Sequence, residues 1–134
     1  WKGWYIHHST TTLGYIVATS EDAATKYKVK YYGASAGFND GVWRHLAWVM
    51  PDKNLPAGWV FYVNGAAVST TDGSGPGTVS TMDTSEPLKL GGKNTNNQNK
   101  YLNGALDDVR IYSRVLSAVE INGAYIEGLG VTRP

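Results

Sequence analysis

Apolar and polar positions alternate in short runs along most of this chain, and glycine, asparagine and aspartate separate the runs. Such alternation is typical of half-buried β-strands, because neighbouring side chains of a strand point to opposite faces. No apolar repeat of 3.6 residues is sustained before residue 117. The pattern predicts an all-β sandwich or jelly roll with strands near residues 3–8, 13–19, 26–32, 42–50, 58–64, 66–70, 78–82, 87–91 and 101–112.

Two local signals refine this prediction. Asn64-Gly65 lies between two apolar runs, and both residue types tolerate positive φ, which predicts a β-hairpin turn. Ser117 followed by Glu120 forms a capping box, with Leu116 and Ile121 placed as a hydrophobic staple. We therefore expect the chain to finish in a short helical turn. Residues 72–77 and 94–99 are predicted to be loops because they are rich in glycine or amides.

Composition excludes several classes of protein. The 134 residues suffice for one domain, and the net charge of +1 gives no field that would attract nucleic acid. The chain has no cysteine, so it has neither disulfides nor thiolate metal sites. No apolar stretch is long enough for membrane insertion. The chain starts at Trp1 and no signal peptide is visible, so we expect a fragment or a processed chain.

The final third of the chain carries a longer motif, Gly104-Ala-Leu-Asp-Asp-Val-Arg-Ile-Tyr112, followed by Arg114, Leu116, Ser117, Glu120 and Ile121. This motif resembles the closing segment of laminin-G-like domains (LamG and pentraxin type) in the concanavalin A-like lectin/glucanase superfamily. Residues 41–49, 61–65 and 88–92 resemble three further segments of these domains, in the same order.

The resemblance implies an antiparallel jelly-roll β-sandwich. The additional strands with which such domains usually open are not visible here. We therefore expect residues 1–134 to form a single laminin-G-like domain that lacks its opening strands.

Asp107 is the candidate metal ligand. The resemblance nominates it for a structural Ca²⁺, because the first aspartate of this motif often holds calcium in related proteins. Calcium requires about 6–8 oxygen ligands, and the other ligands often come from the opening strands. The alternative role for Asp107 is a hydrogen bond or an ion pair with Arg110 or Arg114.

Aromatic residues divide between core and candidate ligand contacts. Trp43, Trp59, Phe61 and Tyr62 match core positions of the family. Trp48 lies on the other face of its predicted strand from Trp43, so it is either packed or free to stack on a sugar ring from a concave outer face.

Polar side chains supply the remaining candidates. Lys26, Lys28 and Lys30 form a row on one strand face, which either protects a sheet edge or binds an anionic polysaccharide. Amides of the 94–99 loop, Asn94, Asn96 and Asn97, are suited to sugar hydroxyls but are equally compatible with an ordinary polar loop. His7, His8 and His45 do not have the spacing of a metal site, and we expect His45 to be packed and hydrogen-bonded.

The sequence does not predict an enzyme. Glucanases of this superfamily carry an E-x-D-x-x-E pattern, which is absent, and no phosphate-binding loop occurs. Two functions remain. The first is a non-catalytic carbohydrate-binding or adhesion module of a larger extracellular protein, with a polysaccharide or glycan as its partner. The second is a structural domain that contacts neighbouring protein subunits at a cell or virion surface.

The two functions predict different surfaces. Sugar binding predicts an exposed tryptophan or tyrosine with amides and carboxylates nearby. Assembly predicts that Trp1, Trp4, Trp48 or the pair Tyr27 and Tyr31 is buried by another chain.

Overall fold

The computed structural model of the protein describes residues 3–8, 15–22, 26–32, 38, 40–83, 85, 87–95 and 98–130. Its strands are β1 (Gly3–His8), β2 (Tyr15–Asp22), β3 (Lys26–Tyr31), β4 (Leu46–Val49), β5 (Val60–Val63), β6 (Ala66–Val68), β7 (Thr71–Asp72), β8 (Gly92–Thr95) and β9 (Gln98–Tyr101). A 3-10 helix, η1 (Pro56–Gly58), precedes β5, and an α-helix, α1 (Ala118–Gly130), closes the described chain.

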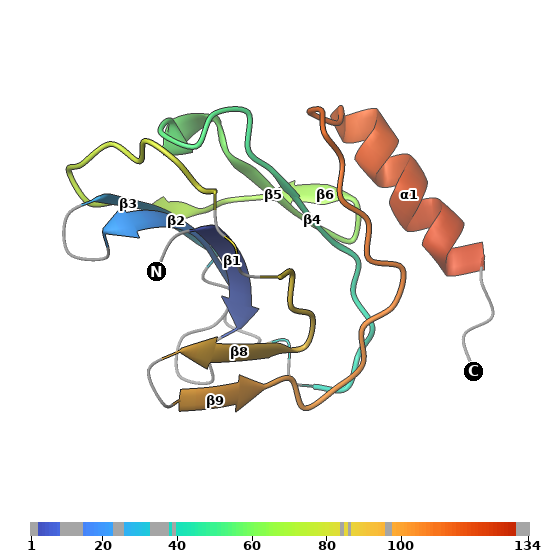
Figure 1. The fold of residues 1–134 in the computed structure, drawn as a ribbon. Helices are drawn as coiled ribbons and strands as arrows, with labels where there is room; N and C mark the ends of the chain where they lie inside the picture. Colours follow the sequence, from blue (N-terminus) through green and yellow to red (C-terminus); the bar gives the residue numbers. More distant parts are fainter. Residues whose placement is uncertain are drawn as a thin grey trace.

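Every strand pairing of the described residues is antiparallel. One sheet has the order β1-β2-β3-β7, a second has the order β4-β5-β6, and β8 pairs with β9 in a hairpin. Figure 1 shows β4, β5 and β6 above the first sheet, the β8–β9 hairpin below, and α1 at one side. The predicted all-β antiparallel sandwich with a C-terminal helical element is confirmed.

The core lies on both faces of β5. Phe61 and Tyr62 are neighbours in this strand, so they point to opposite faces, and both are buried. The ring of Phe61 stacks on Tyr32, which follows β3, at 6.1 Å between centroids. Trp59 is buried as well, with its indole N–H donating to the carbonyl of Asp52 at 2.6 Å. Three of the four predicted core aromatics are therefore confirmed.

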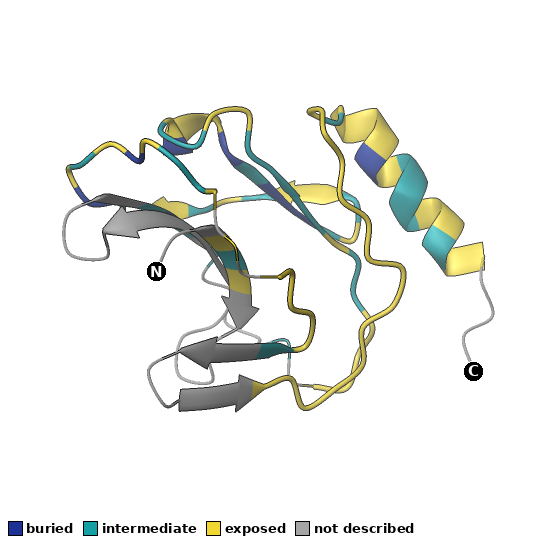
Figure 2. Ribbon diagram, in the orientation of Figure 1, coloured by how far each residue is buried: buried dark blue, intermediate teal, exposed yellow. Residues whose placement is uncertain are grey.

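Trp43 is the exception, because half of its surface is exposed. It precedes β4, which starts only at Leu46, so the position that the family resemblance assigned to the core lies outside the strand here. Figure 2 shows buried positions on β5 and α1, and exposed positions along most of the segment between β9 and the helix.

Helix α1 begins at the predicted capping box. The hydroxyl of Ser117 accepts a hydrogen bond from the backbone N–H of Glu120 at 3.3 Å, and the Glu120 carboxylate accepts one from the Ser117 N–H at 2.8 Å. The helix has 13 residues, so the predicted helical turn is the first turn of a longer element. Ile121 is its buried anchor.

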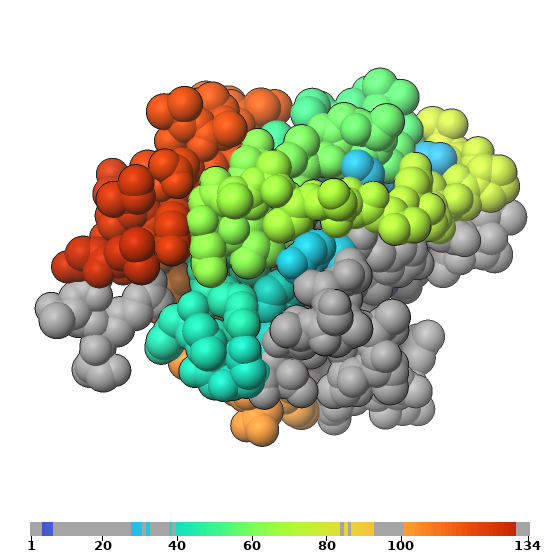
Figure 3. Space-filling view, turned by 180° about the vertical axis from the view of Figure 1, so that it is seen from behind, coloured from blue at the N-terminus to red at the C-terminus, as the bar shows by residue number. Residues whose placement is uncertain are grey.

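The hairpin turn and the helix meet closely. Asn64 and Gly65 have φ values of 50° and 77°, as the sequence predicts for this turn. A Cβ at Gly65 would lie 2.7 Å from the Asn122 side-chain oxygen and 2.9 Å from the Tyr125 ring, so only glycine fits here. Figure 3 shows, from behind, α1 lying directly against this hairpin.

Three predicted strands are wrong. Residues 78–82 form no strand, because the Asn54 side chain donates to the Val79 carbonyl at 2.9 Å and accepts from its N–H at 2.7 Å. This amide takes the place of a strand partner. Residues 87–91 lead into β8 without pairing. In 101–112 only Tyr101 belongs to a strand, and the φ of 51° at Asp108 interrupts the extended chain.

The predicted loop over residues 94–99 is also wrong in part. Thr95 pairs with Gln98 and Asn94 pairs with Asn99 in the β8–β9 ladder. Amide-rich sequence lowers strand propensity, but pairing across a hairpin outweighs that preference here.

Candidate functional site

An open groove of about 520 Å³ lies between the end of the β8–β9 hairpin and the segment that follows it. It is lined by Leu90, Gly91, Leu102, Gly104, Leu106, Asp107, Asp108 and Val109. It is shallow and largely open to solvent. The lining combines exposed aliphatic side chains with two carboxylates from neighbouring residues.

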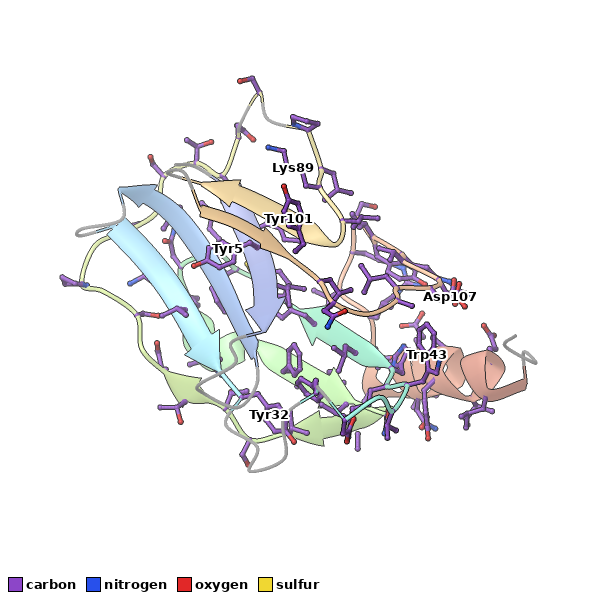
Figure 4. The ribbon with its side chains drawn as sticks, turned by 90° about the horizontal axis from the view of Figure 1, so that it is seen from below. Tyr5, Tyr32, Trp43, Lys89, Tyr101 and Asp107 are labelled. Atoms are coloured by element: carbon purple, nitrogen blue, oxygen red, sulfur yellow. The ribbon has the colours of Figure 1, made fainter. Side chains whose placement is uncertain are left out.

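The β8–β9 hairpin brings the two sides of this groove together. Tyr101 pairs with Gly92, and the N–H of Leu102 donates to the Gly91 carbonyl at 2.8 Å. Tyr101 immediately precedes the groove residue Leu102, and 75% of its surface is exposed. Figure 4 shows Tyr101 on the hairpin and Asp107 in the segment beyond it. Tyr101, an exposed aromatic residue, is therefore the chain neighbour of a residue that lines the groove.

The second carboxylate of the groove is held by an ion pair. Asp108 accepts a hydrogen bond from the Arg110 guanidinium at 2.8 Å. This bond, together with a hydrogen bond to Tyr112, raises the pKa of Arg110 above its usual value. Arg110 also lies 3.7 Å from the Glu127 carboxylate of α1. The groove wall is thus linked to the helix by charged side chains.

The described residues do not form a metal centre by themselves. They contain no group of three or more histidine, aspartate or glutamate side chains placed to hold a metal ion. Calcium binding at Asp107 stays a prediction. In the alternative ion-pair role, the two predicted arginine partners bind other acids: Arg110 binds Asp108, and Arg114 binds Glu120 at 2.6 Å.

Trp48 lies between the two sheets rather than on an outer face. Its ring centroid is 5.9 Å from that of Trp4 and 5.9 Å from that of Trp59. The side chain is half-buried, and its indole nitrogen is buried without a hydrogen-bond partner among the described residues. A void of about 10 Å³ adjoins it. Packing therefore accounts for Trp48, and sugar stacking on this residue stays a prediction.

Two of the three candidate lysines donate to the main chain. The Lys28 ammonium lies 2.9 Å from the Gly75 carbonyl, and the Lys30 ammonium lies 2.9 Å from the Trp59 carbonyl. Burial raises the pKa of Asp72, but hydrogen bonds from Ser74 and the charges of Lys30 and Lys28 outweigh it and lower the pKa overall. Both ammonium groups thus hold the fold together, and binding of an anionic glycan by this row stays a prediction.

Several predicted site residues fall outside what the structure describes. Asn96 and Asn97 lie outside the described residues, and of Lys26 and Asn94 only the backbone positions in β3 and β8 are described. The structure therefore brings none of them into a described site with Trp48 or Asp107.

His45 is packed, as predicted. Its ring lies 5.9 Å from that of Tyr125 in α1, and burial lowers its pKa. Its Nδ1 atom is buried without a hydrogen-bond partner among the described residues, so the expected side-chain hydrogen bond at this atom is not formed.

The sequence did not identify Tyr101, Leu90 or Leu102 as site residues. Leu90 and Leu102 were assigned to strands, where alternating aliphatic residues are normally core. The available signal was the position of Tyr101, a large aromatic residue directly after an amide-rich stretch. The position of Tyr101 points to the groove only once the structure is known, because the hairpin places Gly91 next to Leu102.

The structure was compared with known proteins. A solved structure of an S-layer domain-containing protein (residues 221-444) from Clostridium thermocellum ATCC 27405 is 22% identical, with a TM-score of 0.46, over 92% of this chain. The chain spans 63% of the length of that structure. A comparison with curated proteins gives no match.

A family model gives the assignment. The Laminin_G_3 model, described as the concanavalin A-like lectin/glucanases superfamily, matches residues 2–122. The match spans both sheets, the groove and the start of α1. This chain therefore belongs to the laminin-G-like family of the concanavalin A-like lectin/glucanase superfamily.

Proposed function

We propose that the protein is a non-catalytic carbohydrate-binding module of an extracellular or surface-attached protein. The observation that carries this proposal is the open groove of about 520 Å³, with two carboxylates and several exposed aliphatic side chains in its lining. Exposed Tyr101 immediately precedes the lining residue Leu102 in the chain. Membership of a lectin-like superfamily supports the same proposal.

The groove offers both kinds of contact that a sugar needs. A pyranose ring has an apolar face of C–H groups, which suits the aliphatic side chains of Leu90, Leu102 and Leu106. Its hydroxyl groups are hydrogen-bond donors, and ionised carboxylates are acceptors only. Asp107 and Asp108 are therefore suited to bind hydroxyls at the rim.

The carboxylates of the groove do not suggest glycoside hydrolysis. A hydrolase needs an acid with a raised pKa and a second carboxylate on the other side of the scissile bond. Asp108 is ion-paired with Arg110, and Asp107 is its immediate neighbour in the chain. This arrangement supports a binding role without catalysis.

A second candidate function is protein assembly. Exposed apolar residues between β9 and α1, including Ile111, Tyr112 and Val115, favour contact with a neighbouring subunit.

Within the described residues, no helix has both the length and the apolar character needed to span a membrane.

A glycan array of neutral, acidic and amino sugars tests the first function. We expect the wild-type protein to retain one glycan class, and Tyr101→Ala and Asp107→Asn each to weaken that binding at least tenfold. Val119→Ala serves as a control, because Val119 is 81% exposed on α1 and does not line the groove. Absence of any retained glycan, or binding that is unchanged in both groove variants, would contradict the proposal.

A further inference from the structure

The chain contains the dipeptide Asn-Gly three times, and the structure places each copy in a different backbone environment. The three copies are Asn64-Gly65, Asn103-Gly104 and Asn122-Gly123. An asparagine followed by glycine is especially prone to deamidation, because glycine has no Cβ to shield its backbone nitrogen from the preceding side chain. All three copies share this local chemistry, so differences among their reaction rates in the native protein must come from the fold.

The first copy is held in the hairpin turn between β5 and β6. The Asn64 side-chain oxygen accepts a hydrogen bond from the His45 N–H at 3.0 Å, and the Asn64 N–H donates to the His45 carbonyl at 2.8 Å. Helix α1 lies against the same turn, since a Cβ at Gly65 would meet Asn122 and Tyr125. The Asn64 side chain and the Gly65 backbone are therefore both restrained.

The copy at Asn122-Gly123 lies inside α1. Gly123 is the sixth residue of this helix, so its N–H donates to a carbonyl one turn earlier. The Gly123 nitrogen cannot turn toward the Asn122 side chain without breaking that hydrogen bond. Reaction at Asn122 therefore requires local opening of the helix.

The copy at Asn103-Gly104 lies in the bend after β9, where neither kind of restraint acts. Asn103 is exposed, and within the described part of the chain neither its side chain nor the Gly104 N–H takes part in a hydrogen bond. The last hydrogen bond of the hairpin before it joins the Leu102 N–H to the Gly91 carbonyl. Gly104 lines the open groove. The Gly104 nitrogen can therefore approach the Asn103 side chain, and water reaches both.

We propose that Asn103 is a site of spontaneous deamidation in the folded protein. The Gly104 backbone nitrogen attacks the side-chain carbonyl carbon of Asn103 and forms a C–N bond. The side-chain amide group leaves as ammonia, taking the proton of the Gly104 nitrogen, and a five-membered succinimide remains. Water then adds to one of the two ring carbonyls and opens the ring, which gives aspartate or isoaspartate at position 103. Water is the only other reactant.

Deamidation at Asn103 would change the groove. Either product adds a negative charge next to Gly104, in a lining that already contains Asp107 and Asp108. Isoaspartate also inserts a methylene group into the main chain between Leu102 and Gly104, which both line the groove. The deamidated protein should therefore bind a glycan more weakly in this groove. This consequence rests on the proposed function, whereas the deamidation itself does not.

Peptide mapping of the full chain, incubated at pH 8 and 37 °C, measures the three sites separately. Trypsin cleaves after lysine and arginine, so the sites fall in three peptides, residues 54–89, 101–110 and 115–134. We expect aspartate and isoaspartate to accumulate at Asn103 at least tenfold faster than at Asn64 or Asn122. In guanidinium chloride, where the fold is lost, the three rates should agree. A native rate at Asn103 no higher than those at Asn64 and Asn122 would overturn the proposal.

Gly104→Ala tests the cyclisation step. A Cβ at Gly104 would come no closer than 3.7 Å to the Leu102 side chain, so the folded state accommodates alanine. We expect this variant to slow deamidation at Asn103 at least fivefold with an unchanged melting temperature, because the methyl group hinders attack by the backbone nitrogen. Gly58→Ala is the matched control and should leave the rate unchanged, since no atom lies within 4 Å of its added Cβ. Deamidation of Gly104→Ala at the wild-type rate would exclude attack by this nitrogen.

Asn103→Asp separates the modification from its effect on binding. This variant reproduces one product, and on the glycan array we expect it to bind at least threefold more weakly than the fresh wild type. If the wild type retains a glycan and Asn103→Asp binds it equally well, the effect on the groove is wrong while the deamidation stands. If no glycan is retained, the proposed function fails, and peptide mapping still decides whether Asn103 is modified.

Discussion

The indole rings of Trp48 and Trp59 meet edge to face between the two sheets, with 5.9 Å between their centroids and an interplanar angle of 68°. Aromatic pairs favour this geometry because the positive edge of one ring meets the negative face of the other. The contact joins β4 to the residue just before β5, and Trp4 of β1 packs on the same ring of Trp48. Trp48 is therefore a packing residue shared by both sheets.

Trp48→Ala should lower the free energy of unfolding by about 3 kcal/mol, because it removes a large side chain from between the sheets. Urea denaturation followed by circular dichroism measures this loss. Trp43→Ala is the control with the same change of side chain at a half-exposed position, and we expect it to cost less than about 1 kcal/mol. Equal losses in the two variants would show that Trp48 does not join the sheets.

Ser117→Ala should destabilise the protein by about 1 kcal/mol, the usual cost of removing an N-cap hydroxyl. The Ser117 hydroxyl accepts from the N–H of Glu120, and that N–H would lose its partner. Thermal unfolding measures the change. Ser113→Ala, at an exposed serine four residues earlier, should leave the melting temperature unchanged. A similar shift in both variants would argue against the capping box.

Stability should fall when the pH decreases from about 4.5 to about 2. The Arg114 guanidinium, followed by hydrogen bonds from Ser117, lowers the pKa of Glu120 from 4.5 to about 2. A carboxylate with a lowered folded-state pKa stabilises the fold fully above its unfolded pKa, and this stabilisation is lost as the pH falls through the folded pKa. Melting temperatures of the wild type and Glu120→Gln should therefore differ at pH 6 and converge near pH 2. A difference that is constant with pH would contradict this assignment.

Gly65→Ala should destabilise the protein by more than about 1 kcal/mol, because its φ is 77° and a Cβ would meet Asn122 and Tyr125. Gly41→Ala is a close control: its φ is 76°, but no atom lies within 4 Å of the added Cβ. The difference in unfolding free energy between the two variants isolates the contact with α1. If both variants lose the same unfolding free energy, the contact between α1 and the Asn64-Gly65 turn does not restrict residue 65.

Removal of calcium tests the prediction for Asp107. If Asp107 holds Ca²⁺, a chelator should lower the melting temperature of the wild type, added calcium should restore it, and Asp107→Asn should abolish the response. An unchanged melting temperature in chelator would favour the hydrogen-bond or ion-pair role for Asp107.

The sequence predicted the parts of the fold that depend on local chemistry. The Asn64-Gly65 turn and the Ser117 capping box are correct because each depends on a few neighbouring residues. The strand predicted over residues 78–82 failed because its backbone partner is the distant side chain of Asn54, which no alternation pattern contains. Long-range pairing of this kind is decided by tertiary structure.

The candidate site was less predictable than the fold. Trp48 was a candidate ligand contact because its strand is apolar on both faces; it packs against Trp4 and Trp59, and sugar stacking on it stays a prediction. The groove could not be identified, since it requires Leu90 and Leu102 to meet through the β8–β9 hairpin. Only Asp107 was both predicted as a site residue and found in the groove lining.

The bonds from Lys28 and Lys30 to main-chain carbonyls have a practical consequence for a chain without cysteines. These two amines take part of the role that disulfide bridges play elsewhere, since each ties β3 to a segment distant in the sequence. Acylation would remove both their charge and their donors. Amine-coupled immobilisation or dye labelling would therefore damage the protein wherever it reached them, whereas attachment through an added terminal tag would not.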